Sequence, residues 1–204
     1  MTVVAGPFFA AAALLGAAGA LKVVRPRSTV DALRSASLPG TRSGAGPLAA
    51  PWAGRLLGLG ELAVAVAALG FGGRAAAALV FAAYLGFALF TARLLRVAEA
   101  GAPCGCFGAE DSPARPLHVL VNAMIAATAA AAVAWPTPGL RAVLAEQPGR
   151  GLPFLGLTAM CGWLLFVMLT VVPDLQSVMS ADSSGVVQAT AQLDGRPGNR
   201  AVQS

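Results

Sequence analysis

Two cysteines stand one residue apart in the segment PCGCFG, where Gly105 separates Cys104 from Cys106. A thiolate is the nucleophile of disulfide exchange, and a second nearby thiol resolves the mixed disulfide that forms. The same thiols and His118 would also make three ligands for zinc or Cu(I), although a structural zinc site needs a fourth ligand, and none is obvious in the sequence. The spacing alone does not choose among these roles; we favour a redox pair and leave a metal site or a merely structural role as alternatives.

One carboxylate, Glu61, lies well inside an apolar segment, GLGELAVAVAAL. A charge in hydrocarbon is costly, so this side chain is expected to face the other helices and to have a partner there. We expect Arg93 or Arg96 to supply the opposite charge and Asn122 to supply a hydrogen bond. Glu61 is then either a proton acceptor, an anchor for a buried polar site, or a structural contact between helices.

His118, the sole histidine, precedes Asn122 by four residues, which places both on one side of the same helix. Successive membrane helices return to the same face at every second connection, so the two adjacent cysteines, Arg93, Arg96 and His118 should share one face. A cation close to a thiol stabilises the thiolate. These residues are therefore predicted to support the redox pair, although His118 could equally cap the helix that begins after Pro116.

The helices that position these residues are predicted to lie in a membrane. The chain is 57% hydrophobic and only 11% charged, with a mean hydropathy of +0.73, whereas soluble proteins carry roughly 25% charged residues. A net charge of +5 could suggest a nucleic-acid partner. The basic residues flank apolar segments, however, and form no stripe interleaved with aromatic residues, so the lipid bilayer is the expected partner and nucleic acid is excluded.

The sequence predicts an all-α fold, a polytopic transmembrane bundle of four to five spans with a core of four helices. About 20 apolar residues cross a bilayer, and such runs cover residues 3–24, 52–71, 75–97, 117–135 and 154–172. A short interfacial helix is expected over residues 29–35. Cys161, alone among apolar residues of the last run, is expected to be an inert hydrophobe. We expect one membrane domain over residues 1–175 and a disordered tail over residues 176–204.

The sequence also predicts how the bundle is oriented across the membrane. The first apolar run lacks a charged segment before it, so we expect a retained helix with its N-terminus outside and not a signal peptide. Lysine and arginine concentrate in the first and third connections, which the positive-inside rule assigns to the cytoplasm. The paired cysteines would then face the reducing side, where a lasting structural disulfide is not expected. Direct oxidation of an exported protein requires the opposite orientation.

The segment of residues 58–69, the PCGCFG motif after the third apolar run and Asn122 early in the fourth resemble the MauE family of methylamine-utilisation membrane proteins, allied to DoxX-like redox-associated proteins. The resemblance extends over residues 3–172. It implies a membrane protein that matures a disulfide-rich exported enzyme subunit with a thioredoxin-like partner. It also implies that Cys104 and Cys106 pass electrons and that Glu61 is the family's intramembrane glutamate. Val121 departs from the family, in which an arginine often precedes the asparagine.

The leading prediction is a multi-pass membrane thiol–disulfide oxidoreductase that supports disulfide formation in an exported client, in the family the methylamine dehydrogenase subunit, through a thioredoxin-like partner. A quinone cofactor is left open, and haem is disfavoured by the single histidine and the lack of a C-x-x-C-H motif. The alternatives are a non-enzymatic assembly or chaperone-like subunit and a small transporter. The predicted site comprises Cys104, Cys106 and Glu61, with Arg93, Arg96, His118 and Asn122 in support.

Overall fold

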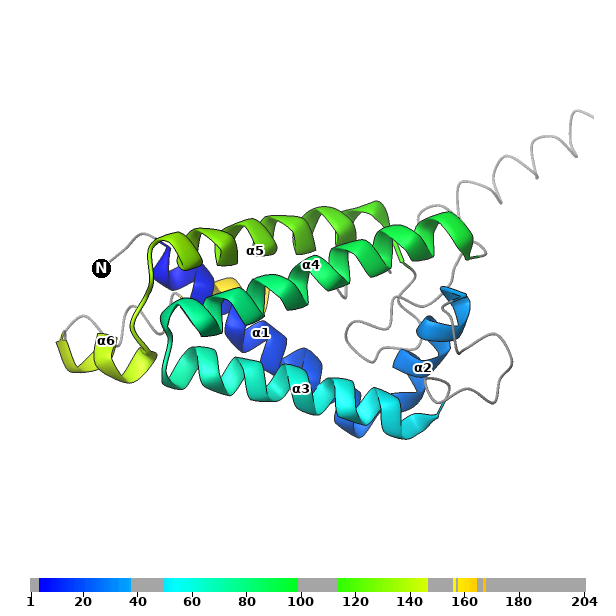
Figure 1. The fold of residues 1–204 in the computed structure, drawn as a ribbon, viewed down its shortest axis with the longest axis horizontal. Coiled ribbons are helices and arrows are strands. Elements are labelled where there is room, and N and C mark those ends of the chain that lie inside the picture. The colour runs from blue at the N-terminus through cyan, green and yellow to red at the C-terminus, as the bar shows by residue number, and fades with distance from the viewer. Residues whose placement is uncertain are drawn as a thin grey trace, which may run out of the picture.

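The fold is known from a computed structural model that describes residues 4–37, 50–98, 114–146, 156, 158–164 and 167. Within these residues, four helices are long and apolar enough to cross a membrane. They are α1 (Ala5–Val24), α3 (Pro51–Gly70), α4 (Gly73–Val97) and α5 (Pro116–Ala134). Two shorter helices, α2 (Pro26–Ser35) and α6 (Leu140–Glu146), lie at opposite ends of the bundle (Figure 1). The predicted all-α, multi-pass membrane fold is confirmed.

The helix boundaries follow from local sequence. Pro26, Pro51 and Pro116 stand in the first turns of α2, α3 and α5, where the missing N–H has no intrahelical partner to lose. The four predicted spans each agree with a helix to within two residues at either end. The expected interfacial helix is confirmed as α2, and it starts three residues earlier than predicted.

The predictions for the chain after α5 are confirmed less fully than those for the four spans. The connection after α5 contains the short helix α6, which the sequence did not predict and in which Val143 is buried. The predicted fifth span, residues 154–172, lies mostly outside the described residues, although residues 156, 158–164 and 167 within it are helical. The predicted tail of residues 176–204 lies outside them altogether.

The bundle consists of two closely packed helix pairs. Helix α1 packs along α3, and α4 packs along α5, whereas α3 and α4 contact each other much less although a short turn joins them. Figure 1 shows α1 passing behind α3 and α4 at an angle. The hydroxyl of Tyr84 on α4 donates a hydrogen bond to the Ala11 carbonyl oxygen on α1, at 2.8 Å, in the buried core. This bond connects the two pairs.

Helices α1 and α3 approach each other closely because glycine faces glycine. A Cβ atom added to Gly19 would lie 2.6 Å from the Gly58 carbonyl oxygen, and one added to Gly58 would lie 2.6 Å from the Gly19 carbonyl oxygen. Small residues allow such backbone contact in lipid, where van der Waals packing drives helix association. The position of α1 across α3 therefore depends on the absence of side chains at these two residues.

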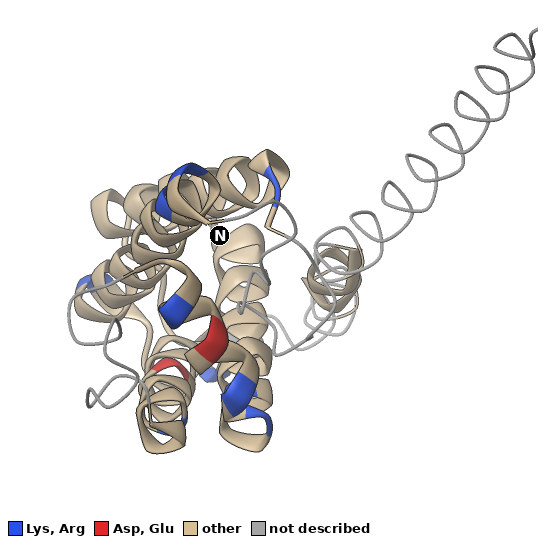
Figure 2. Cartoon of the chain, turned by 90° about the vertical axis from the view of Figure 1, so that its right-hand side faces the viewer, with Lys and Arg blue, Asp and Glu red and all other residues tan. Residues whose placement is uncertain are grey.

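The end of the bundle that carries α2 is strongly basic. Helix α2 packs against α3 and α4 there and turns Arg27, Asp31 and Arg34 outward, as an amphipathic helix at a membrane surface does. Figure 2 looks onto this end. Of the nine described arginines, all but Arg74 and Arg141 belong to it: Arg25, Arg27, Arg34, Arg55, Arg93, Arg96 and Arg115. The positive-inside rule predicts that this end faces the cytoplasm.

Replacing Gly58 by alanine should weaken the bundle, because the new methyl group would meet the backbone of α1. Overpacking of this kind costs about 1–3 kcal/mol. Reversible unfolding in mixed micelles should show Gly58→Ala to be less stable than the native protein by that amount. Gly60→Ala is the matched control, since a Cβ there meets nothing within 4 Å. Equal stability of the two variants would contradict the close approach of α1 and α3.

Candidate functional site

A buried ion pair joins α1 to α3. The Lys22 ammonium donates hydrogen bonds to both carboxylate oxygens of Glu61, with Nζ 2.8 Å from Oε1 and 2.7 Å from Oε2. The two side chains are only 2% and 4% exposed. The other ion pair in the described part of the chain, between Arg34 and Asp31, is exposed on α2. Two opposite charges thus neutralise each other inside the bundle.

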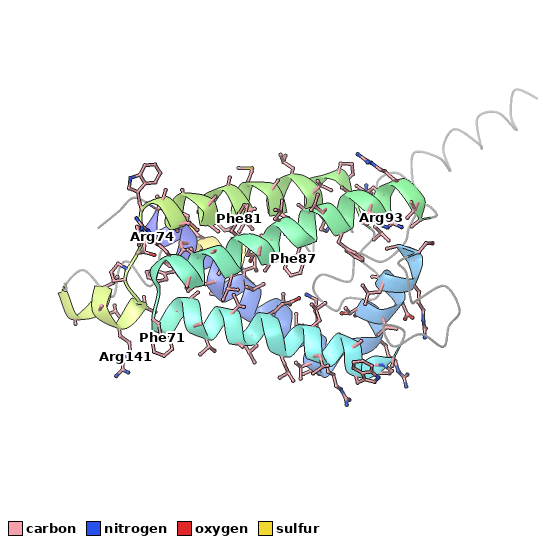
Figure 3. The ribbon with its side chains drawn as sticks, in the orientation of Figure 1. Phe71, Arg74, Phe81, Phe87, Arg93 and Arg141 are labelled. Carbon is pink, nitrogen blue, oxygen red and sulfur yellow. The ribbon has the colours of Figure 1, made fainter. Side chains whose placement is uncertain are left out.

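An aromatic ring from α4 completes the surroundings of the ammonium. Lys22 Nζ lies 4.6 Å from the centre of the Phe87 ring, within the range of a cation–π interaction. Phe87 in turn packs edge-on against Tyr84, with ring centres 5.7 Å apart and an interplanar angle of 86°. Figure 3 shows Phe87 directed from α4 toward the space between α4 and α3. The ion pair therefore contacts three helices.

The glycines that bring α1 and α3 together also position the charges. Gly19 precedes Lys22 by three residues, and Gly58 precedes Glu61 by three residues, so on each helix the glycine and the charge lie on one face. Glu61 follows Pro51 by ten residues, which corresponds to about 15 Å along α3. The carboxylate thus lies near the middle of a membrane-crossing helix, and Lys22 reaches it from the last turn of α1.

The expected partners of Glu61 were wrong. The Arg93 guanidinium donates hydrogen bonds to the carbonyl oxygens of Ala36 and Ser37 at the end of α2, at 3.0 and 3.3 Å. Arg93 lies six residues beyond Phe87, and therefore about 9 Å farther along α4 toward the basic end than the level of the ion pair. Arg96 is exposed in the last turn of α4.

His118 and Asn122 belong to the α4–α5 pair and not to the helix pair that holds Glu61. Both are buried on α5, at 2% and 4% exposure, and α5 packs mainly against α4. The His118 Nδ1 atom accepts a hydrogen bond from the Arg115 backbone N–H at 3.2 Å, which caps the helix start. The structure thus confirms the capping role that the sequence offered as the alternative for His118.

The two paired cysteines, Cys104 and Cys106, lie outside the described residues. Their segment joins the end of α4 to the start of α5, so chain order attaches it to the basic end of the bundle, where Figure 3 labels Arg93. Arg93, Arg96 and His118 flank that segment at this end, whereas Glu61 lies deeper and in the other helix pair. Cys161 is exposed and carries a free thiol.

Lys22 is a site residue that the sequence did not predict, since it falls among the basic residues that flank the apolar runs. Two signals in the sequence identify it. It is the only lysine among fourteen basic residues, and it stands before the end of its apolar run. It also follows a glycine by three residues, as Glu61 does, and this shared spacing indicates two helix faces that meet.

Breaking the ion pair from one side should destabilise the bundle strongly. Lys22→Met leaves a buried carboxylate without its cation, and Glu61→Gln leaves a buried ammonium without its anion; such losses cost about 3–5 kcal/mol. The double variant Lys22→Met/Glu61→Gln contains no buried charge and should recover most of the stability. Reversible unfolding of all four proteins in mixed micelles measures the coupling. A double variant as unstable as the sum of the two single losses would contradict the pairing.

Comparison with known proteins matches most of the chain to one family. Residues 1–136 match the family model described as methylamine utilisation protein MauE. The matched region includes helices α1 to α5, the Lys22–Glu61 pair and the segment with Cys104 and Cys106, and it ends before the predicted fifth span. Searches of the curated proteins and of the solved structures find no match. Since the match covers 136 of 204 residues, the chain belongs to the MauE family.

Proposed function

We propose that this MauE-family membrane protein is a thiol–disulfide oxidoreductase that uses Cys104 and Cys106 as its redox pair. In this proposal it exchanges electrons with a thioredoxin-like partner and serves the maturation of an exported, disulfide-containing protein. The observation that carries the proposal is the C-G-C motif, which lies within the region matched to the family. Two thiols separated by one glycine can form only a small, strained ring, and strained disulfides are the labile, exchangeable ones.

The surroundings of the motif support this chemistry. The cysteine segment is attached to the end of the bundle that carries most of the described arginines, with Arg93 and Arg96 before it and Arg115 after it. Positive charge near a thiol stabilises the thiolate, which is the attacking species. Arg93 is held by hydrogen bonds to the end of α2, so its charge is fixed close to the point at which the segment leaves α4.

The proposed exchange needs no reagent besides the partner's own cysteines. One thiolate of the pair attacks a disulfide of the partner, which forms a mixed disulfide and releases one partner thiolate. The second cysteine then attacks the mixed disulfide, so that the pair is oxidised and the partner leaves with two thiols. The reverse sequence oxidises the partner and reduces the pair. Two electrons move in either direction, and each departing thiolate takes up the proton that an attacking thiol gives up.

The Lys22–Glu61 pair has a structural part in this proposal. Its carboxylate receives two hydrogen bonds from one ammonium and lies in a different helix pair from the one that carries the cysteine segment. The transporter alternative requires Glu61 to exchange its partner during a cycle. The double variant Lys22→Met/Glu61→Gln separates these roles. An oxidoreductase should retain thiol exchange in this variant, whereas a transporter that depends on Glu61 should lose transport.

Acid quenching of native membranes followed by labelling with a maleimide that retards the protein on a gel should reveal the redox pair. We expect a population with one reactive thiol, Cys161, before reduction and three reactive thiols after reduction. Cys161→Ser should remove exactly one label from each count, and Cys104→Ser/Cys106→Ser should leave one label under both conditions. Three reactive thiols before and after reduction, in every growth condition tested, would contradict a redox-active pair.

The single variants test the partner. Cys104→Ser or Cys106→Ser, whichever removes the resolving thiol, should accumulate a mixed disulfide with a thioredoxin-like protein, visible as a reducible band on a gel. The same maleimide, made membrane-impermeant, also determines the orientation of the pair. Labelling from outside the cell allows direct exchange with an exported client, and labelling only in opened membranes places the exchange in the cytoplasm. Absence of a mixed disulfide in both single variants would favour a non-enzymatic assembly role.

A further inference from the structure

A cavity of about 330 Å³ lies beside the ion pair, in the region where α3 and α4 diverge. Small-molecule sites in proteins begin at about this volume. Helix α2 closes the cavity at the basic end through Thr29, Ala32 and Leu33. The remaining lining comes from α1, α3 and α4: Lys22, Leu57, Glu61, Ala82, Ala83, Gly86, Phe87 and Phe90.

The cavity has a polar floor and apolar walls. Lys22 and Glu61 provide the charged groups among its lining residues, and they neutralise each other. An ammonium has three N–H donors, and two of those of Lys22 bond to Glu61. The Phe87 ring lies over the ammonium, with its centre 4.6 Å from Nζ. A molecule that enters the cavity would thus meet a neutralised ion pair and an aromatic ring.

The cavity is accessible from the membrane. Leu57, Ala82 and Gly86 line it and are themselves exposed. All three lie within membrane-crossing helices, where the neighbouring medium is hydrocarbon. Phe87 and Phe90 present aromatic rings to the interior, and aromatic rings pack well against a planar ring. A molecule that enters by this route must be lipid-soluble.

We propose that this cavity binds the head group of a lipid-soluble quinone. A fatty acid would bring a second anion next to Glu61, and an amine would bring a second cation next to Lys22. A plain acyl chain would offer no polar group to the ion pair in the cavity. A quinone carbonyl accepts a hydrogen bond from Lys22, a hydroquinone hydroxyl donates one to Glu61, and the ring lies between Phe87 and Phe90.

This site goes beyond thiol exchange and does not depend on it. None of the cavity residues is a cysteine, so binding should persist when Cys104 and Cys106 are both replaced by serine. A quinone also accepts two electrons and two protons, the number that a dithiol releases when it forms a disulfide. Binding is therefore a property that can be measured separately from exchange.

The test is calorimetric titration of decylubiquinone into the protein in lipid nanodiscs, with empty nanodiscs as the blank. The ring of this quinone is fully substituted and does not add to thiols. We expect saturable binding of one quinone per chain in the native protein and in Cys104→Ser/Cys106→Ser. The variant Gly86→Leu fills the cavity from a position where a Cβ meets nothing within 4 Å, and it should weaken binding by about tenfold or more.

Gly60→Leu is the matched control, because Gly60 is equally unobstructed and does not line the cavity; it should bind as the native protein does. Ala82→Leu, at a second exposed lining position, should weaken binding as Gly86→Leu does. Phenyldecane, which has a ring and the same tail length but no carbonyl, should bind at least tenfold more weakly than the quinone. Equal binding of the two compounds, equal binding by Gly86→Leu, Ala82→Leu and the native protein, or no saturable binding would overturn the proposal.

Discussion

The contact between the Lys22 ammonium and the Glu61 carboxylate constrains the whole bundle. Neither charge has water to solvate it at that depth, so each must keep the other within hydrogen-bond distance. The contact requires α1 and α3 to approach at Gly19 and Gly58, where backbone lies against backbone. Phe87 then covers the ammonium and brings α4 to the pair, and α5 follows because it packs along α4. One buried polar interaction thus selects one arrangement among the many that apolar helices could adopt.

A buried ion pair is a costly way to hold helices together, because apolar residues of similar size often serve as well or better. Its presence is easier to understand if its polarity has a use. The divergence of α3 from α4 leaves a cavity above the pair, so that the charges lie at the boundary between packed helices and a lipid-accessible space. The cysteine segment is attached to the same end of the bundle but to the other helix pair. The proposed thiol site and the neutralised charge pair are thus two chemically distinct regions of the protein.

Hydropathy and turn residues predicted the four spans and the interfacial helix to within a few residues, since the length of an apolar run is itself the signal. The same analysis predicted that Glu61 is buried and paired, from the cost of a charge in lipid. It did not find Lys22, because helices that are apolar on nearly every side do not reveal which face meets which neighbour. Arg93 or Arg96 was the expected partner from the shared face, but even Arg93, the nearer along α4, lies about two turns from the level of the ion pair. His118 was predicted with two alternatives, of which helix capping is confirmed.

Because Lys22 is the only lysine in the sequence, selective ¹⁵N-lysine labelling yields a single side-chain ammonium signal, and this signal reports directly on the interaction that organises the bundle. An ammonium bonded to a buried carboxylate and covered by the Phe87 ring should exchange its protons slowly with water and show a ring-current shift to high field. Both properties should change in Glu61→Gln, and the shift should disappear in Phe87→Leu. An ammonium signal broadened by rapid exchange with water, and unchanged in both variants, would show that Lys22 is solvated at the membrane surface and would contradict the packing described.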